Sequence, residues 1–107
     1  MASGILGSIA ISSANNWQQA YPVPSNTYSV FNVSFTNTNA TSVTIKLAIA
    51  ATTSPASNEV FEFQTTVVGY GVFERTGLVA NATKQVMVQA SNTGVNVNVY
   101  GIETSTS

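Results

Sequence analysis

Cysteine and histidine are absent from the 107 residues, and charged residues are scarce. Without cysteine no disulfide can form, so the stability of the fold must come from packing. Transition-metal sites draw mainly on cysteine and histidine, so neither a metal site nor a cofactor is expected. Charged residues make up 7% of the chain, against about 25% in an average soluble protein. The polar surface must therefore consist mostly of Ser, Thr, Asn and Gln.

The scarcity of basic residues disfavours nucleic acid as a partner. Only Lys46, Arg75 and Lys84 are basic, and the formal net charge is -1, whereas binding to a phosphate backbone requires several cations. A soluble monomer usually relies on charge to stay separate from its neighbours. We therefore expect other protein chains to cover much of this surface, in a homo-oligomer or a high-copy assembly.

Long apolar runs are also lacking. The longest apolar stretch, 45–51, is short and contains Lys46, so no segment is expected to cross a membrane. The first residues do not show the basic segment and long apolar run of a secretory signal. The sequence therefore favours a protein that is made in the cytoplasm and not secreted.

What the sequence does contain is a period of two. Over 28–50, apolar and polar side chains alternate in two runs separated by the turn-forming segment 37–40, which predicts a β-hairpin with one apolar face. Further runs predict more strands, with turns roughly every 8 to 12 residues. The predicted fold is all-β, a single antiparallel β-sandwich of seven or eight strands. We expect an immunoglobulin-like type, with a jelly roll as the alternative.

The same alternation predicts core residues and boundaries. Phe31, Phe35, Phe61 and Phe63 fall on apolar faces and are predicted to lie in the core. Gly77 is a candidate for a bulge in the strand expected over 72–79. The predicted organisation is an N-terminal arm or edge strand over 1–16, a sandwich over 17–103 and a C-terminal tail over 104–107.

Residues suited to catalysis are few. Catalysis by a nucleophile needs a base beside it, and without His or Asp the candidate bases are the glutamates and lysines. Glu59 and Glu62 are three residues apart in an expected strand, so they would lie on opposite faces and make a poor acid and base pair. A Ser and Lys pair stays open on sequence alone. We expect a protein that is not an enzyme.

Four aromatic residues are candidates for binding sugar. Trp17, Tyr21, Tyr28 and Tyr70 could form a flat platform for sugar rings. The alternative is that they cap the open ends of the sandwich, since aromatic side chains more often supply core area than binding sites.

An adjacent pair of opposite charges, Glu74 and Arg75, also has two interpretations. The arginine could dock a neighbouring subunit through a bidentate contact to a carboxylate. The alternative is an exposed ion pair, worth about 0 to 1 kcal/mol. In so charge-poor a chain, an ionic contact would have few rivals for setting the register of docking.

A family resemblance rests on four segments in a fixed order, which read MASGILG (1–7), YPVP (21–24), GVFERTG (71–77) and VYGIETST (99–106). Together they resemble the small β-sandwich virion proteins of tailed phages, of the decoration or cement type, especially those of marine cyanophages. The resemblance covers nearly the whole chain. This sequence departs from the pattern mainly in its Asn-rich turn and its Trp17.

The resemblance implies a structural protein of the virion, bound to the outside of the capsid or to the tail. We expect a head decoration protein whose partner is the major capsid protein or another virion protein. The alternatives are a tail, baseplate or fibre-associated component and a module that binds host polysaccharide. The expected docking elements are 2–11 and 103–107, and deleting 2–8 is expected to abolish capsid binding and leave a folded domain. The predicted docking residues are Ile5, Leu6, Ile9, Glu74, Arg75 and Glu103.

Overall fold

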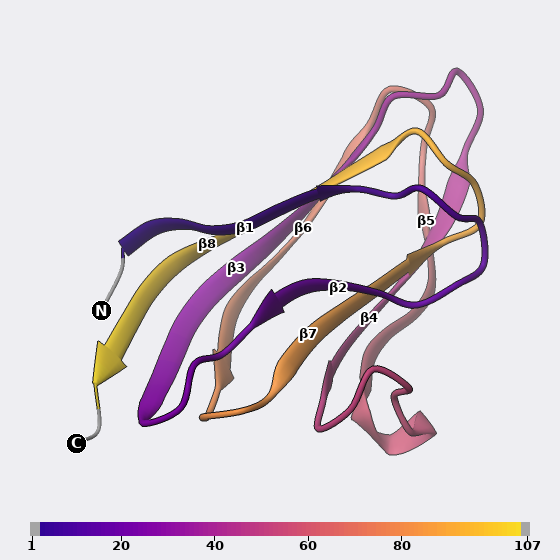
Figure 1. The fold of residues 1–107 in the computed structure, drawn as a ribbon. Coiled ribbons are helices and arrows are strands. Elements are labelled where there is room, and N and C mark those ends of the chain that lie inside the picture. The colour runs from indigo at the N-terminus through magenta and orange to yellow at the C-terminus, as the bar shows by residue number, and fades with distance from the viewer. Residues whose placement is uncertain (1–2, 106–107) are drawn as a thin grey trace.

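Residues 3–105 are described by the structure, a computed structural model, and they form eight strands and one short 3-10 helix. The strands are β1 (Ser3–Ala10), β2 (Gln18–Pro22), β3 (Thr27–Asn37), β4 (Val43–Ala50), β5 (Val60–Val67), β6 (Val72–Ala80), β7 (Gln85–Ala90) and β8 (Val95–Ser105), and the helix is η1 (Ser57–Glu59). They build two layers that face each other (Figure 1).

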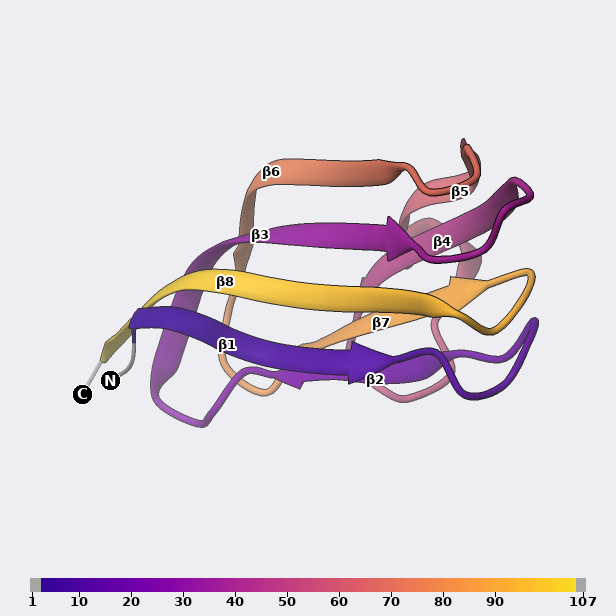
Figure 2. The same ribbon diagram turned by 90° about the horizontal axis from the view of Figure 1, so that it is seen from above.

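Each layer is a four-stranded antiparallel sheet. Sheet A has the order β1-β8-β3-β6, which can be followed in Figure 2, and sheet B has the order β2-β7-β4-β5. The apolar faces of both sheets meet in a core that contains Phe31 and Phe35, both almost fully buried. The expected all-β architecture of antiparallel sheets is confirmed, and so is the core position of these two phenylalanines.

The strand pairs are nested along the chain. β1 pairs with β8, β2 with β7, β3 with β6 and β4 with β5. Such pairs arise when one long antiparallel ribbon is folded across two sheets, which is the arrangement of a jelly roll. In an immunoglobulin-like sandwich the first two strands are neighbours in one sheet, whereas here β1 and β2 lie in different sheets. The immunoglobulin-like type is not confirmed, and the strand order follows the jelly-roll alternative.

The prediction of a hairpin over 28–50 is wrong. β3 lies in sheet A and β4 in sheet B, and the two strands are not hydrogen-bonded neighbours. Each presents its apolar side chains to the same core from opposite sides. Crossing between sheets therefore produces the same alternation of apolar and polar residues as a hairpin would. The turn-forming residues do fall at the connection between the two strands.

The prediction that Phe61 and Phe63 lie in the core is also wrong, because β5 is irregular. Their side chains are 47% and 68% exposed. Ile45 pairs with Thr65 and Leu47 with Glu62, so two residues of β5 lie opposite one residue of β4. Gln64, one of these two, has a φ of 56°. An extra residue of this kind reverses the alternation of faces along a strand. A second register shift follows between Leu47 and Ala48.

The bulge proposed at Gly77 is confirmed. Phe31 pairs with Leu78 and Val33 with Arg75, so β6 has one extra residue between these pairs. Gly77 has a φ of 70°, a left-handed conformation that glycine adopts without steric cost. The backbone N–H of Gly77 donates to the side-chain oxygen of Asn32 at 3.1 Å.

The two ends of the described chain belong to sheet A. β1 is an edge strand of that sheet, as the sequence suggested for 1–16, and Ile11, which follows it, is buried in the core. β8 continues to Ser105, so 104–105 are part of a strand and not of a tail. Residues 1–2 and 106–107 lie outside the described residues. The first residue of the expected docking element 2–11 and the last two residues of 103–107 are therefore not described.

Candidate interaction surfaces

The docking residues predicted near the N-terminus are mostly structural. Leu6 and Ile9 pack against the main core. Ile5 is exposed, and it pairs in register with Tyr100 on the outer face of sheet A. Only Ile5 of these three is therefore available to a partner.

Glu103, the docking residue predicted near the C-terminus, takes part in a hydrogen-bond network between the two sheets. The Tyr21 hydroxyl of β2 donates to the Glu103 carboxylate of β8 and is 2.7 Å from the Ser29 hydroxyl of β3. Tyr21 and Ser29 are buried. Burial, and then the hydrogen bond to Glu103, raise the pKa of Tyr21 to about 12. Glu103 therefore joins the two sheets within one molecule.

Arg75, predicted to dock a neighbour, forms an ion pair with Glu62 of the same chain. Glu62 lies on β5 and Arg75 on β6, the edge strands of sheets B and A. Thr65 also donates to Glu62, at 2.9 Å. The pair thus links the two sheets along one side of the sandwich. Glu74, by contrast, is exposed on the outer face of sheet A.

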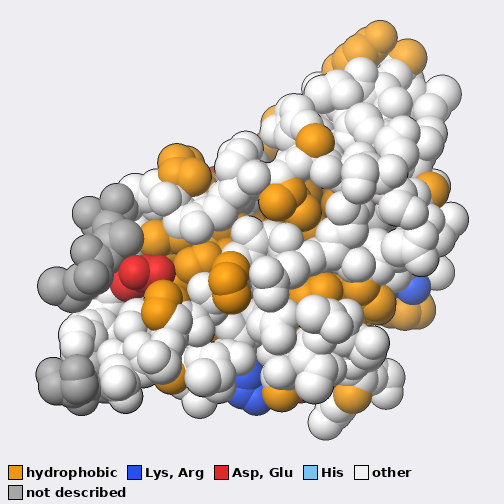
Figure 3. Space-filling model, viewed as in Figure 1, with side chains coloured by type: hydrophobic (Ala, Val, Ile, Leu, Met, Phe, Trp, Pro, Cys, Tyr) orange, Lys and Arg blue, Asp and Glu red, His pale blue; other side chains and the backbone are white. Residues whose placement is uncertain are grey.

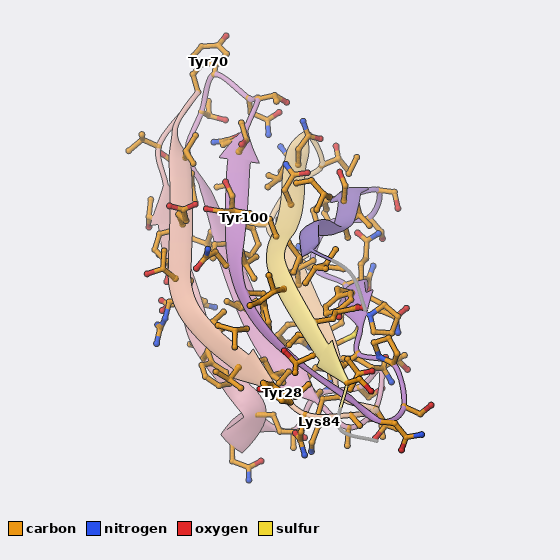
Figure 4. The ribbon with its side chains drawn as sticks, turned by 90° about the vertical axis from the view of Figure 1, so that its left-hand side faces the viewer. Tyr28, Tyr70, Lys84 and Tyr100 are labelled. Atoms are coloured by element: carbon orange, nitrogen blue, oxygen red, sulfur yellow. The ribbon has the colours of Figure 1, made fainter. Side chains whose placement is uncertain are left out.

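The four aromatic residues considered for sugar binding are not brought together. Tyr21 is buried, and Trp17 packs on a second small cluster that contains Ala48 and Met87. Tyr28 and Tyr70 lie near opposite ends of the molecule (Figure 4). No common platform is formed by these four side chains.

The molecule exposes apolar side chains that the alternation did not reveal. Little of the surface seen in Figure 3 is charged, and apolar atoms are visible over much of it. Of the ten large hydrophobic residues that are exposed within 3–105, six lie between positions 60 and 80, on β5, β6 and their connection: Phe61, Phe63, Val68, Tyr70, Val72 and Val79. They lie on two different sheets and on the connection between them, so each of these surfaces is considered separately.

The connection between β5 and β6 is the most prominent of these surfaces, and we call residues 68–72 the tip. Tyr70 is 74% exposed, and Val68 and Val72 beside it are exposed as well. Figure 4 shows Tyr70 standing beyond the ends of the strands. The tip thus offers one aromatic ring flanked by two valines.

The backbone of the tip is fixed against the connection between β3 and β4. The N–H of Tyr70 donates to the carbonyl of Asn39 at 2.9 Å, and the N–H of Gly71 donates to the carbonyl of Val68 at 2.9 Å. A Cβ atom at Gly69 would lie 2.1 Å from the carbonyl oxygen of Ala40. Only glycine therefore allows this close approach.

One buried asparagine holds both connections. The Asn37 side-chain amide donates to the carbonyls of Thr41 at 2.9 Å and Val68 at 3.1 Å, and its oxygen accepts from the N–H of Asn39 at 2.9 Å. Asn37 is 1% exposed. Its bonds replace the strand pairing that the tip lacks, because β5 and β6 belong to different sheets.

The conformation of Tyr70 is unusual for an aromatic residue. Its φ of 58° lies in the left-handed region, which side chains larger than glycine or asparagine seldom occupy. Strained residues of this kind gather at functional sites. In the sequence, an aromatic residue between two glycines, Gly69 and Gly71, was the available signal.

A second apolar surface lies on the outer face of sheet A. Val79 pairs in register with Val30, and Val30 with Ile102, so three exposed side chains form a row across β6, β3 and β8. Ile5 and Tyr100 lie beside this row on β1 and β8. We call this group the sheet A row.

No protein-family model, curated protein or solved structure matches this sequence. Within 3–105 no helix is long and apolar enough to cross a membrane. In the same residues, no three His, Cys, Asp or Glu side chains lie close enough together to hold a metal ion.

Proposed function

We propose that this protein is a non-enzymatic structural protein of a phage virion, a head decoration protein that binds the outer surface of the capsid through its tip. The exposed and conformationally fixed Tyr70 is the observation that carries the proposal. The four sequence segments described above, which resemble small virion proteins of tailed phages, supply the identity of the partner.

The tip has the properties of an anchor in a protein interface. Interface energy is concentrated in a few residues, among which tyrosine is enriched, and truncating such a residue costs 2 kcal/mol or more. Binding is weakened when a loop must first become ordered. Here the backbone is already held by Asn37, Asn39 and Gly69. The tip could therefore enter an apolar pocket of the capsid at little cost in conformational entropy.

The fold agrees with this proposal without deciding it. Jelly rolls occur in viral capsid proteins and also in lectins, and function is carried by a site and not by a fold. The site favours the capsid over a polysaccharide, because Tyr70 and Tyr28 lie near opposite ends of the molecule (Figure 4), Tyr21 is buried and Trp17 packs on a small cluster.

The proposal is tested by counting copies of the chain in purified virions with quantitative mass spectrometry. A head decoration protein is expected in hundreds of copies per particle. Tens of copies or fewer would instead identify a tail component, and absence from the particle would refute a virion role.

The same count tests the tip. We expect Tyr70→Ala to weaken binding to the capsid more than tenfold, because a loss of about 2 kcal/mol exceeds a tenfold change in affinity, and so to reduce the copies per virion when the protein is supplied below saturation. Tyr28→Ala is the matched control, since it removes an exposed tyrosine near the other end of the molecule. Equal copy numbers for Tyr70→Ala and the unaltered chain would show that the tip is not the anchor.

A further inference from the structure

Most charged side chains within 3–105 have partners in the same chain. Arg75 is paired with Glu62, and Glu103 accepts a hydrogen bond from Tyr21. Two further charged residues, Glu59 and Lys84, attract each other.

Glu59 accepts hydrogen bonds from the backbone N–H groups of Ala56 at 2.9 Å and Ala51 at 3.2 Å. These bonds lower the pKa of Glu59, and attraction to Lys84 contributes further in the same direction. Within 3–105, Glu103 has no cation beside it but accepts from the Tyr21 hydroxyl, whereas Glu74 and Lys46 form neither an ion pair nor a hydrogen bond.

Glu74 lies on the outer face of sheet A. It pairs in register with Ser34, while its neighbours Phe73 and Arg75 pair with the buried residues Phe35 and Val33. Its side chain is exposed and forms neither an ion pair nor a hydrogen bond within the described part of the chain. Val72 lies on this face too, and the sheet A row crosses the same face.

Lys46 lies on the outer face of sheet B. Its neighbours Ile45 and Leu47 are completely buried in the core, so the lysine side chain points the other way. Its ammonium group is 4.7 Å from the centre of the Phe63 ring. Phe63 is exposed on this face because of the bulge in β5. Each outer face thus combines one charge with exposed apolar area.

We propose that a second copy of this chain occupies the outer face of sheet A, and that it does so with the outer face of its sheet B, so that Glu74 of one copy meets Lys46 of the next. This contact between copies goes beyond the proposed binding to the capsid. It leaves Tyr70 free, because Tyr70 is located at an end of the sandwich (Figure 4).

Charge selects this arrangement over a two-fold symmetric dimer. A contact between two sheet A faces would leave Glu74 without a cation, and a contact between two sheet B faces would leave Lys46 without an anion. Sheet A against sheet B brings opposite charges together. Such a contact joins two different surfaces, so each added copy leaves one of each face free and a row of copies can grow.

The apolar area and the ion pair of this contact have different effects. Burial of Phe63 and the sheet A row supplies the affinity, at about 25 cal/mol per Å² of apolar surface. A surface ion pair by itself is worth only about 0 to 1 kcal/mol. Its role is to set the register, because other arrangements bury Glu74 and Lys46 without an opposite charge.

The test uses exchanged charges and sedimentation velocity of the purified full chain over a range of concentrations. The unaltered chain should form oligomers as its concentration rises. Lys46→Glu and Glu74→Lys should each raise the concentration needed for association at least tenfold. The double variant should associate like the unaltered chain, and so should an equimolar mixture of the two single variants, since both restore opposite charges at the contact.

Lys84→Glu is the matched control, because it changes the net charge as Lys46→Glu does but lies elsewhere, near Tyr28 in Figure 4. It should leave association unchanged. The proposal is overturned if the unaltered chain stays monomeric at every concentration, if Lys84→Glu disrupts association as strongly as Lys46→Glu, or if the double variant fails to restore it. None of these results bears on the number of copies per virion. The proposed function is therefore tested separately, by that count.

Discussion

Tyr21 shows how a single side chain can join the two sheets. Its hydroxyl has one hydrogen, which it donates to Glu103, so the Ser29 hydroxyl must donate to the tyrosine oxygen. One residue of sheet B is thereby bonded to two strands of sheet A. Removing this hydroxyl leaves a carboxylate and a buried serine without their partner.

We therefore expect Tyr21→Phe to lower the free energy of unfolding by about 1 to 3 kcal/mol at neutral pH. The raised pKa of Tyr21 adds a pH dependence. An unfolded tyrosine ionises near 10.0, whereas Tyr21 keeps its proton to about 12. Between these values the unfolded state binds fewer protons, so stability is complete below pH 10 and falls as pH rises toward 12.

Urea unfolding at several pH values checks both effects. The loss of stability between pH 10 and 12 should be smaller in Tyr21→Phe than in the unaltered chain. Tyr28→Phe is the control, because Tyr28 is exposed. An identical pH dependence in Tyr21→Phe would mean that the Tyr21 proton does not stabilise the fold.

At the residue scale, the sequence predicted burial only where the strands are regular. Phe31 and Phe35 are in the core because β3 alternates without interruption. Phe63 is exposed because Gln64 adds a residue to β5. No glycine lies at that position to indicate a bulge in the sequence. The role of Tyr21 depends on Glu103, a residue 82 positions away, and a single sequence holds no signal of such a pair.

At the scale of an element, the tip depends on Asn37, the last residue of β3. We expect Asn37→Ala to lower the free energy of unfolding by about 1 to 3 kcal/mol, because the buried carbonyl of Val67 and the partly buried carbonyls of Thr41 and Val68 lose their donor. The amide hydrogens of Tyr70 and Gly71 should then exchange faster, since the connection that holds them loosens.

Hydrogen exchange measured by mass spectrometry tests this expectation. Asn92→Ala is the control, because the Asn92 side chain bonds only to the next residue, Thr93, and is exposed. If exchange over 68–72 is the same in Asn37→Ala and in the unaltered chain, the tip is not held by Asn37.

The elements themselves were predicted better than their pairing. The bulge at Gly77 could be predicted because glycine adopts a positive φ without steric cost. β8 extends to Ser105, into the segment expected to be a tail, because Tyr100 and Ile102 continue the alternation through Gly101. The exposure of the tip could not be predicted, since a turn in the sequence reveals nothing about which of its residues face a partner.

At the scale of the whole molecule, the nested pairing makes the first strand part of the body. β1 pairs with β8 from Ser3 to Ala10, and Leu6 and Ile9 pack on the core. We expect deletion of 2–8 to lower the free energy of unfolding by roughly 3 kcal/mol, since it removes most of the pairing of β1 with β8 and the partly buried Leu6, and full burial of a leucine is worth about 1.5 to 3 kcal/mol. This differs from the folded domain that the sequence led us to expect after this deletion.

Thermal unfolding followed by circular dichroism measures the effect. The substitution Ile5→Ser is the control, since Ile5 is on β1 but exposed. A deletion variant that melts at the same temperature as the full chain would show that β1 is a detachable arm.

The layered architecture could be predicted from alternation, but the path of the chain between layers could not. A strand that returns beside its predecessor and one that crosses to the opposite sheet bury the same side chains, as β3 and β4 show. The difference lies in distant partners such as β8, which pairs with both β1 and β3. Separations of this length leave no periodic signal in a sequence.

The pairing of the first strand with the last also determines where material added to the protein would emerge. Ser3 pairs with Ile102, and Ser105 with Thr27, so both ends of the described chain leave the sandwich on one side. Figure 4 shows Tyr28, the neighbour of Thr27, at the opposite end from Tyr70. A peptide fused to either terminus would thus be displayed away from a surface bound by Tyr70, which makes the chain suited to carrying foreign epitopes.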